Sequence, residues 1–206
     1  MASTWRKRQK KALRTRLLET SLELFRTQGF EQTTVQQIAD EVGVGKGTFF
    51  NHFPTKVTVL VEWYRNLTLD ALAEVEARPH ATARGAMQAL AAALAVRAVA
   101  DPDLWDMKSE NAFADAKLQN EEHGLDSVLD DYCLRHLSAG KARGEIDPDL
   151  DERLMTGMFN AVLTGTAHSW AVAGHAFDLK GTIAARVDFL FRAASSRLDH
   201  APEKAR

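Results

Sequence analysis

The sequence has a single cysteine, Cys133, among its 206 residues, so it cannot form an internal disulfide. A chain without structural disulfides fits the reducing cytoplasm better than the secreted class. The sequence also lacks a long hydrophobic run, since its most apolar stretch, residues 86–100, is alanine-rich, carries Arg97 and is too short to span a bilayer. Residues 5–11 are basic and polar, which argues against a signal peptide. We therefore predict a cytoplasmic protein with no membrane association.

Signatures of catalysis, of metal binding and of cofactor binding are also missing. The sequence has no phosphate-binding loop, no dinucleotide fingerprint and no serine elbow. His168 and His175 have no third ligand at a metal-site spacing, and residues 121–123 lack the Glu-x-x-His spacing of a di-iron bundle. Cys133 and His136 are three residues apart, which is usually incidental on an amphipathic helix. We predict no catalytic residue, no metal and no cofactor, and we keep a helical enzyme as the weakest alternative.

The net charge of −2 hides an uneven distribution of charge along the chain. Residues 1–56 contain ten Lys or Arg against five Asp or Glu, whereas the other residues contain 16 against 23. A basic N-terminal quarter on an acidic body indicates that one end of the protein meets a polyanion. The first ten residues are predicted to be a flexible basic arm, which either reaches phosphates or makes no fixed contact.

Residues 33–56 contain the pattern of two short helices joined by a tight turn. Thr34 can cap the first helix, and Gln37 three residues later completes a capping box. Gly43 provides the left-handed residue that ends this helix. The second helix is predicted from residue 45 to residue 53, and it leaves Lys46, Thr48, Asn51 and His52 facing outward. Two short helices with a glycine turn are typical of a DNA-binding helix-turn-helix.

This stretch resembles the DNA-binding motif of the TetR (tetracycline-repressor-like) family of bacterial transcription regulators. The resemblance is carried by Thr-Thr-Val-x-x-Ile-Ala-x-x-x-Gly-Val at 33–44 and Gly-Lys-Gly-Thr-Phe-Phe-x-His-Phe-Pro-Thr-Lys at 45–56. It implies a regulator, most often a repressor, that binds a palindromic operator and leaves it when a small ligand binds. Two residues depart from the family pattern, because serine is usual at Gly45 and tyrosine is usual at Phe50.

We predict that the DNA contacts come from this motif. Lys46 is the best candidate for a base-edge contact, Gly47 lets the backbone approach closely, and Thr48 and Asn51 can contact bases or backbone. His52 and Lys56 are expected to contact phosphates, and Thr34 places helix-end amides near a phosphate. The predicted DNA-binding residues are Thr34, Gly45, Lys46, Gly47, Thr48, Phe50, Asn51, His52 and Lys56.

The whole chain is predicted to be all-α with about nine helices. We expect residues 1–54 to form the helix-turn-helix domain and residues 55–206 to form a domain for ligand binding and dimerisation. Outside the motif, helices are expected at residues 10–28, 56–78, 81–100, 103–122, 125–139, 148–173 and 179–198. In this reading His123-Gly124 separates two helices, and Asp147 caps the helix that follows it.

The resemblance implies a small-molecule pocket in the body, for which the sequence offers apolar candidates. The candidates are Trp63, Trp105, Met107, Phe113, Met158, Phe159 and His168. They favour an apolar or aromatic ligand, although core packing is the more common role for each of them. His168, within an apolar part of its helix, is more often a satisfied core group than a ligand contact.

The last two predicted helices are the candidates for self-association. A small-residue stripe on one helix and an apolar stripe on the other are the expected interface residues, namely Gly157, Ala161, Gly165, Ile183, Val187, Leu190, Phe191 and Ala194. The resemblance favours a homodimer through a four-helix bundle, and packing within one subunit is the other interpretation. The alternative for the whole protein is a helical ligand-binding or protein-interaction module without sequence-specific DNA binding.

Overall fold

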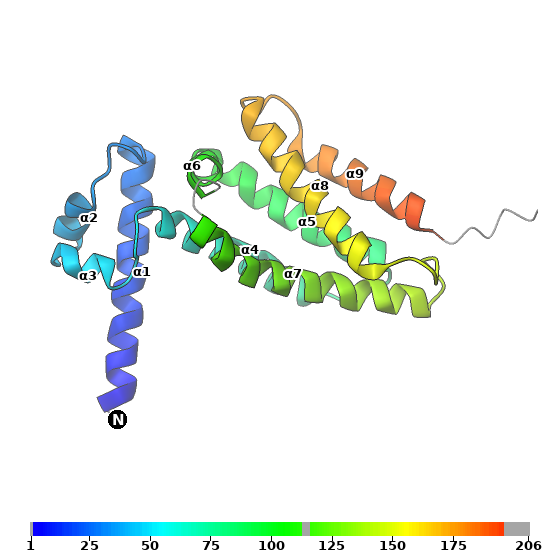
Figure 1. Ribbon diagram of the computed structural model, residues 1–206, viewed down its shortest axis with the longest axis horizontal. Coiled ribbons are helices and arrows are strands. Elements are labelled where there is room, and N and C mark those ends of the chain that lie inside the picture. Colours follow the sequence, from blue (N-terminus) through cyan, green and yellow to red (C-terminus); the bar gives the residue numbers. More distant parts are fainter. Residues whose placement is uncertain (1, 113–115, 196–206) are drawn as a thin grey trace, which may run out of the picture. The chain divides into compact units, whose positions relative to one another are not determined.

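All the regular structure of the described residues is helical (Figure 1). The computed structural model describes residues 2–112 and 116–195, and the side chains of residues 5–111 and 127–195. Over these ranges the chain forms α1 (Ala2–Gln28), α2 (Val35–Val42), α3 (Lys46–Phe50), α4 (Val57–Glu76), α5 (Ala83–Ala100), α6 (Pro102–Ala112), α7 (Ala116–Ala142), α8 (Glu152–Val172) and α9 (Leu179–Ala194). The predicted all-helical class is confirmed. None of the described helices is both long enough and apolar enough to cross a membrane.

The contacts between residues divide the chain into two units. The first contains the chain up to Leu67 together with Asp101–His123, and the second contains Thr68–Ala100 and the chain from Gly124 onward. This division rests on contacts, whereas the predicted division at residues 54 and 55 is one of function, and that boundary stays a prediction.

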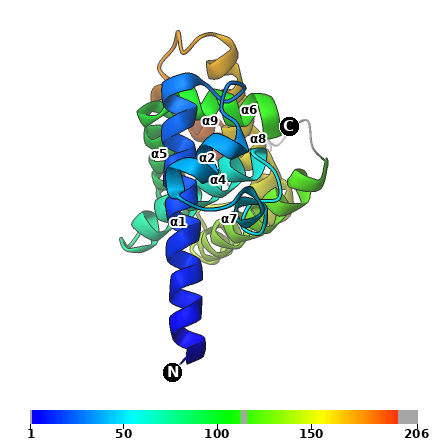
Figure 2. The same ribbon diagram turned by 90° about the vertical axis from the view of Figure 1, so that its left-hand side faces the viewer.

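The core of the first unit is built where α1, α2, α3, α4 and α6 contribute large apolar side chains. It contains Leu17, Leu22, Phe25, Phe30, Ile38, Val42, Phe49, Phe53, Val59, Leu60 and Leu104. α1 packs on the helix-turn-helix, because Leu17 and Phe25 join this cluster with Ile38 and Phe49. Figures 1 and 2 show α2 and α3 beside the C-terminal half of α1, with the N-terminal turns of α1 extending past them.

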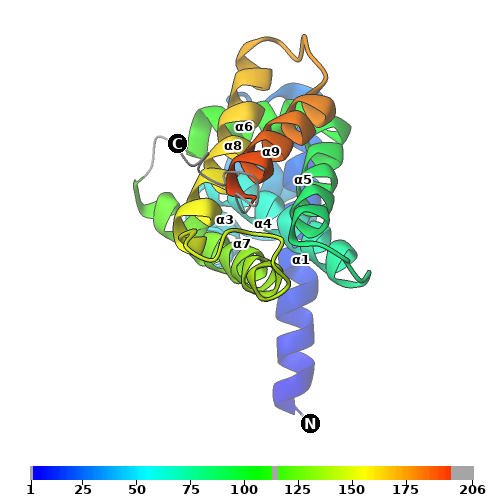
Figure 3. The same ribbon diagram turned by 90° about the vertical axis from the view of Figure 1, so that its right-hand side faces the viewer.

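The second unit packs α9 against α5 and α8 (Figure 3). Its buried side chains include Met87 of α5, Phe159 of α8 and Val187 of α9. The phenolic hydroxyl of Tyr132 on α7 donates to the carbonyl of Ala86 at 3.1 Å, which ties α7 to α5. Arg84 forms an ion pair with Asp188, so α5 and α9 are also joined at their surface.

The predicted start of the first helix near residue 10 is wrong. α1 begins at Ala2, so the basic segment that was expected to be flexible forms the first turns of a 27-residue helix. Residues 2–11 contain neither glycine nor proline, and their alanine, lysine, arginine and glutamine residues have high helix propensity. The basic side chains therefore project from a helix.

Three further boundaries differ from the predictions. α3 ends at Phe50, not at residue 53. α7 runs through His123 and Gly124, because one glycine costs a long helix only about 1 kcal/mol and does not by itself end it. Asp147 does not cap α8. Its side chain accepts from the Asp149 N–H in a local turn, and Asp151 caps α8 by accepting from the N–H groups of Arg153 and Leu154. The predicted end of the last helix at residue 198 lies outside the described residues.

Candidate nucleic-acid interface

α2 is fixed at its start by the predicted capping box. The Thr34 hydroxyl accepts from the Gln37 N–H at 3.2 Å, and the Gln37 side-chain oxygen accepts from the Thr34 N–H at 2.8 Å. Ile38, Ala39 and Val42 are buried, so the apolar face of α2 is turned into the core. Thr34 itself stays exposed, and the start of α2 is therefore open to a ligand.

The turn between α2 and α3 depends on glycine at one position. Gly43 has φ 77° and ψ 38°, the left-handed conformation that ends α2, and its N–H points back to the carbonyls of Ala39 and Asp40. Val44 follows, donates its N–H to the Ala39 carbonyl at 2.9 Å and packs against the core. The predicted role of Gly43 is confirmed.

Gly45 occupies the N-cap position of α3 and offers no side-chain cap, as the sequence indicates. Its backbone, with φ −74° and ψ 149°, is a conformation that serine adopts readily, and a Cβ there would meet no atom within 4 Å. We expect Gly45→Ser to raise the free energy of unfolding by about 0.5–1 kcal/mol, because it adds a cap and removes chain entropy from the unfolded state. Urea denaturation of the two proteins measures this difference.

Gly43→Ser is the matched control for that variant. A Cβ at Gly43 also meets no atom within 4 Å, but its φ of 77° makes a side chain costly, by about 1–2 kcal/mol. The two glycines flank Val44, so the same substitution should change stability in opposite directions. If both variants were destabilised equally, the proposed vacant cap on α3 would be incorrect.

α3 presents three faces. Phe49 is fully buried, and Phe53 beyond the helix lies with its ring 5.7 Å from that of Phe49. Thr48 turns toward α1 and is half-buried. The side exposed to solvent carries Lys46, Gly47, Phe50 and Asn51, which lie within about 140° of one another at 100° per residue. Four of the predicted DNA-binding residues thus share one exposed face.

Arg14 of α1 braces the end of the motif. Its guanidinium lies 3.1 Å from the Glu62 carboxylate of α4, donates to the His52 carbonyl, and stands 4.3 Å above the Phe53 ring. Arg16, two residues further along α1, donates to the Val42 carbonyl at 3.1 Å. Both arginines are therefore structural contacts between α1 and the motif, a role that the sequence did not indicate beyond the basic character of residues 1–56.

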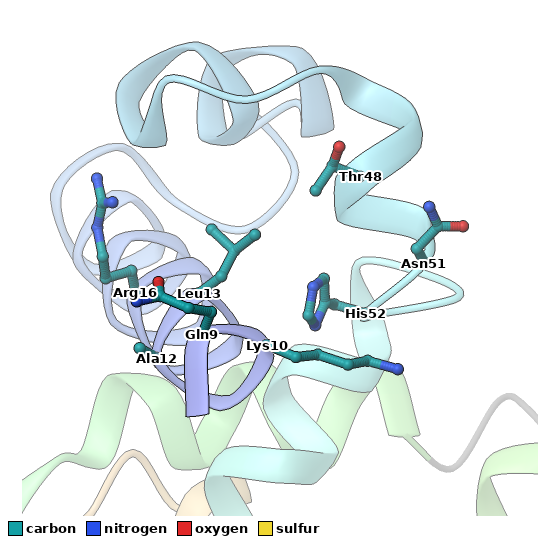
Figure 4. Close-up of a pocket in the computed structure, with 8 residues that line it drawn as sticks. All are labelled: Gln9, Lys10, Ala12, Leu13, Arg16, Thr48, Asn51 and His52. Atoms are coloured by element: carbon teal, nitrogen blue, oxygen red, sulfur yellow. The ribbon is translucent and has the colours of Figure 1, made fainter. Parts of the chain in front are cut away.

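A groove of about 830 Å³ lies between α1 and α3 (Figure 4). Its lining is Gln9, Lys10, Ala12, Leu13, Arg16, Thr48, Asn51 and His52. The two charged side chains of this lining, Lys10 and Arg16, are cations, and most of the other polar groups can donate hydrogen bonds. A groove of this composition favours an anion.

His52 faces this groove but is only 8 % exposed, so the prediction that it faces outward is wrong. Its Nδ1 atom is buried and has no hydrogen-bond partner in the described part of the chain. Burial, with the nearby cations Arg14 and Lys10, lowers the pKa of His52 below its usual value. These effects favour the neutral imidazole over the imidazolium, next to a site that attracts anions.

Lys56 has a role in the protein that the sequence did not indicate. Its ammonium group donates to the carbonyls of Phe30 and Thr33, and it lies 4.1 Å from the centre of the Phe30 ring. Burial lowers the pKa of Lys56. These contacts hold the loop that leads into α2, so the expected phosphate contact of Lys56 is not favoured by this geometry.

Comparison with known proteins agrees with this arrangement. Residues 17–62 match the family described as bacterial regulatory proteins, tetR family. The chain is 31 % identical over 176 residues to the HTH-type transcriptional regulator TcmR of Streptomyces glaucescens, an alignment that covers 79 % of this chain and 76 % of TcmR. The chain belongs to the TetR family. It is a DNA-binding transcription regulator.

Solved TetR-family structures share the fold. FadR of Thermus thermophilus, a TetR-family repressor solved with lauroyl-CoA, is 25 % identical, with a TM-score of 0.76 over 92 % of this chain and 98 % of FadR. FadR of Bacillus subtilis, solved with stearoyl-CoA, is 22 % identical, with a TM-score of 0.67 over 86 % of this chain and 97 % of that one. The second likeness shows the fold alone.

The candidate pocket residues of this TetR-family chain fall in both units. Trp63 and Met107 pack on the core of the first unit, where Trp105 stands edge-on to Tyr64 with ring centres 5.6 Å apart. In the second unit Phe159 is buried, whereas Met158 is 46 % exposed. His168 is exposed, so its expected place in an apolar core is wrong. The Phe113 prediction lies outside the described residues.

The candidate dimer residues divide sharply between the two helices. Gly157, Ala161 and Gly165 of α8 are exposed, as an interface requires. The predicted α9 residues Ile183, Val187, Leu190, Phe191 and Ala194 are instead buried within their own unit. The exposed apolar side chains nearby are Leu154, Met158 and Val172 of α8 and Phe189 of α9. The apolar stripe of α9 therefore serves the subunit core, and Phe189 lies on the opposite, solvent-facing side.

Proposed function

We propose that this regulator is a cytoplasmic repressor that binds a palindromic operator as a homodimer and leaves it when an apolar ligand binds. The observation that carries the DNA-binding part is the exposed face of α3, held on a head that consists of α1, α2 and α3 packed on a shared core. Lys46 supplies a cation that can donate to guanine acceptors, and Asn51 supplies an amide on the same face. Gly47 leaves the backbone between them uncovered.

Phosphate contacts around this face would set the register of the head on DNA. Thr34 stands exposed at the start of α2, where backbone N–H groups favour an anion. Lys10 and Arg16 line the groove between α1 and α3, together with His52. Such contacts position the protein without reading sequence. Lys56 supports this arrangement indirectly, because it holds the loop before Thr34.

Two features support a dimer, namely the small size of the DNA-reading surface on α3 and the exposed small and apolar residues of the second unit. One five-residue helix reads too few bases to select a site, whereas a two-fold dimer doubles the contacts on a palindrome. The exposed stripe of Gly157, Ala161 and Gly165 lets another helix approach closely. Phe189 of α9, which is 66 % exposed, would be covered in such an interface.

The proposed ligand is apolar and binds to the part of the chain outside the head. Large apolar and aromatic side chains in both units support this class, and so does the lauroyl-CoA complex of Thermus thermophilus FadR, whose acyl chain is apolar. A ligand that fits one arrangement of the body better would shift the population away from the DNA-competent state. Acyl-CoA esters of different chain length are the first compounds to test.

Fluorescence anisotropy tests the proposed function. The labelled DNA is the intergenic fragment upstream of the protein's own gene, a scrambled duplex of equal length is the control, and the salt concentration is varied. We expect nanomolar binding to the native fragment, much weaker binding to the scramble, and release from the native fragment on adding an acyl-CoA ester. Equal, weak and steeply salt-dependent binding to the native fragment, to the scramble and to a random-site selection pool would instead indicate a module without sequence-specific DNA binding.

A further inference from the structure

Phe50 is an exposed aromatic residue in the middle of the reading face. Its side chain is 43 % exposed, although the neighbouring Phe49 is fully buried. The two rings meet edge to face, with centres 5.7 Å apart and an angle of 88° between their planes. This contact fixes the ring of Phe50 against the head, so the exposed ring is a preformed apolar surface.

The residues around Phe50 leave its ring accessible to a partner. Lys46 is one turn earlier on the same face, and Gly47 lies on the other side of the ring. A Cβ at Gly47 would meet no atom within 4 Å, so the space beside the ring is open. The face therefore places an uncovered apolar ring between a cation and a bare stretch of backbone.

An apolar ring at this place has one matching group in the major groove. The C5-methyl group of thymine is the apolar feature that distinguishes one base pair from the others, and phenylalanine is among the side chains that contact it. Phe50 has no hydroxyl with which to contact a phosphate. We propose that Phe50 is a specificity-determining residue that reads the methyl group of an operator thymine, an inference that rests on the proposed DNA-binding function.

The test removes the methyl group from the DNA and the ring from the protein. The thymines of the operator fragment are replaced one at a time by deoxyuridine, which keeps base pairing and lacks only the methyl. For the wild-type protein we expect affinity to fall roughly fourfold at one thymine of each half-site, the factor that corresponds to burying one methyl-sized group. Phe50→Gln, which keeps a long side chain but removes the apolar ring, should bind thymine and uracil fragments equally.

Two controls separate this contact from general damage. Phe50→Leu keeps an apolar side chain and should retain part of the preference for thymine. Thermal unfolding of each variant shows whether loss of the Phe49 contact has destabilised the head. A wild-type protein that binds its operator but ignores every uracil substitution would overturn this inference alone, and so would a thymine preference that survives in Phe50→Gln. A protein that does not distinguish operator from scramble would overturn the proposed function itself.

Discussion

Lys46→Ala is expected to weaken operator binding by about 1–3 kcal/mol for each head, which is roughly a 5- to 150-fold loss of affinity. Lys46 is exposed on the outward face of α3, next to Gly47 and Phe50. In this position its ammonium can donate to guanine O6 and N7 in the major groove. Because the side chain is exposed, its removal should not change the stability of the head. Anisotropy with the operator and with single-base variants of it measures both affinity and specificity.

Lys11→Ala is the comparison that gives the first result its meaning. Lys11 is also an exposed lysine, but it lies on α1, next to Lys10, for which a phosphate contact is proposed. Its removal should weaken binding to operator and scramble alike. It should also reduce the slope of log affinity against log salt concentration by about one. Lys46→Ala should instead relax the preference for one base pair. If Lys46→Ala also weakened operator and scramble equally, Lys46 would be a phosphate contact and not a base reader.

The local features of the helix-turn-helix could be predicted because each depends on a few neighbouring residues. The capping box needs only Thr34 and Gln37, and the turn needs only a left-handed glycine at Gly43. The missing cap at Gly45 is a property of the residue itself. Such features are encoded within one or two turns of chain.

Features that depend on the rest of the molecule could not be predicted in the same way. The apolar stripe of α9 correctly indicated a buried face, but periodicity does not say whether the covering surface belongs to the same subunit. Asp147 and Asp151 are equally good caps by residue type, and the actual start of α8 at Glu152 selects the second. Helical projection placed His52 outward, whereas α1 covers it.

The burial of His52 leads to the second large effect, a dependence of DNA binding on pH. The charged groups around it are Lys10 and Arg16 in the groove, Arg14 at its own carbonyl, and Glu62, which is paired with Arg14. Burial and the cations Arg14 and Lys10 lower the pKa of His52 in the free protein. A DNA phosphate in the groove would favour the imidazolium and raise this pKa in the complex.

The sign of the effect follows from the two pKa values. Between the lowered pKa of the free protein and the higher pKa of the complex, DNA binding takes up a proton at His52, so affinity rises as the pH falls. The limit is roughly tenfold per pH unit for each head, since one proton is bound. The free energy of unfolding of the free protein should change in the opposite direction, because the pKa of His52 is higher in the unfolded chain than in the folded protein. The contribution of neutral His52 to stability should be fully present above the unfolded pKa and should decrease as the pH falls toward the folded pKa.

Anisotropy titrations at constant ionic strength, between about pH 5 and pH 8 around the usual histidine pKa, measure this linkage. His52→Gln keeps a polar side chain that cannot titrate, and it should make operator affinity much less dependent on pH. His80→Gln is the matched control, because His80 lies in the second unit, where its Nε2 is 2.9 Å from the Val75 carbonyl. It should leave the dependence intact. If wild type and His52→Gln showed the same slope, the groove beside α3 would not hold a phosphate near His52, and Lys10 and Arg16 would need to be tested as the groove's only anion contacts.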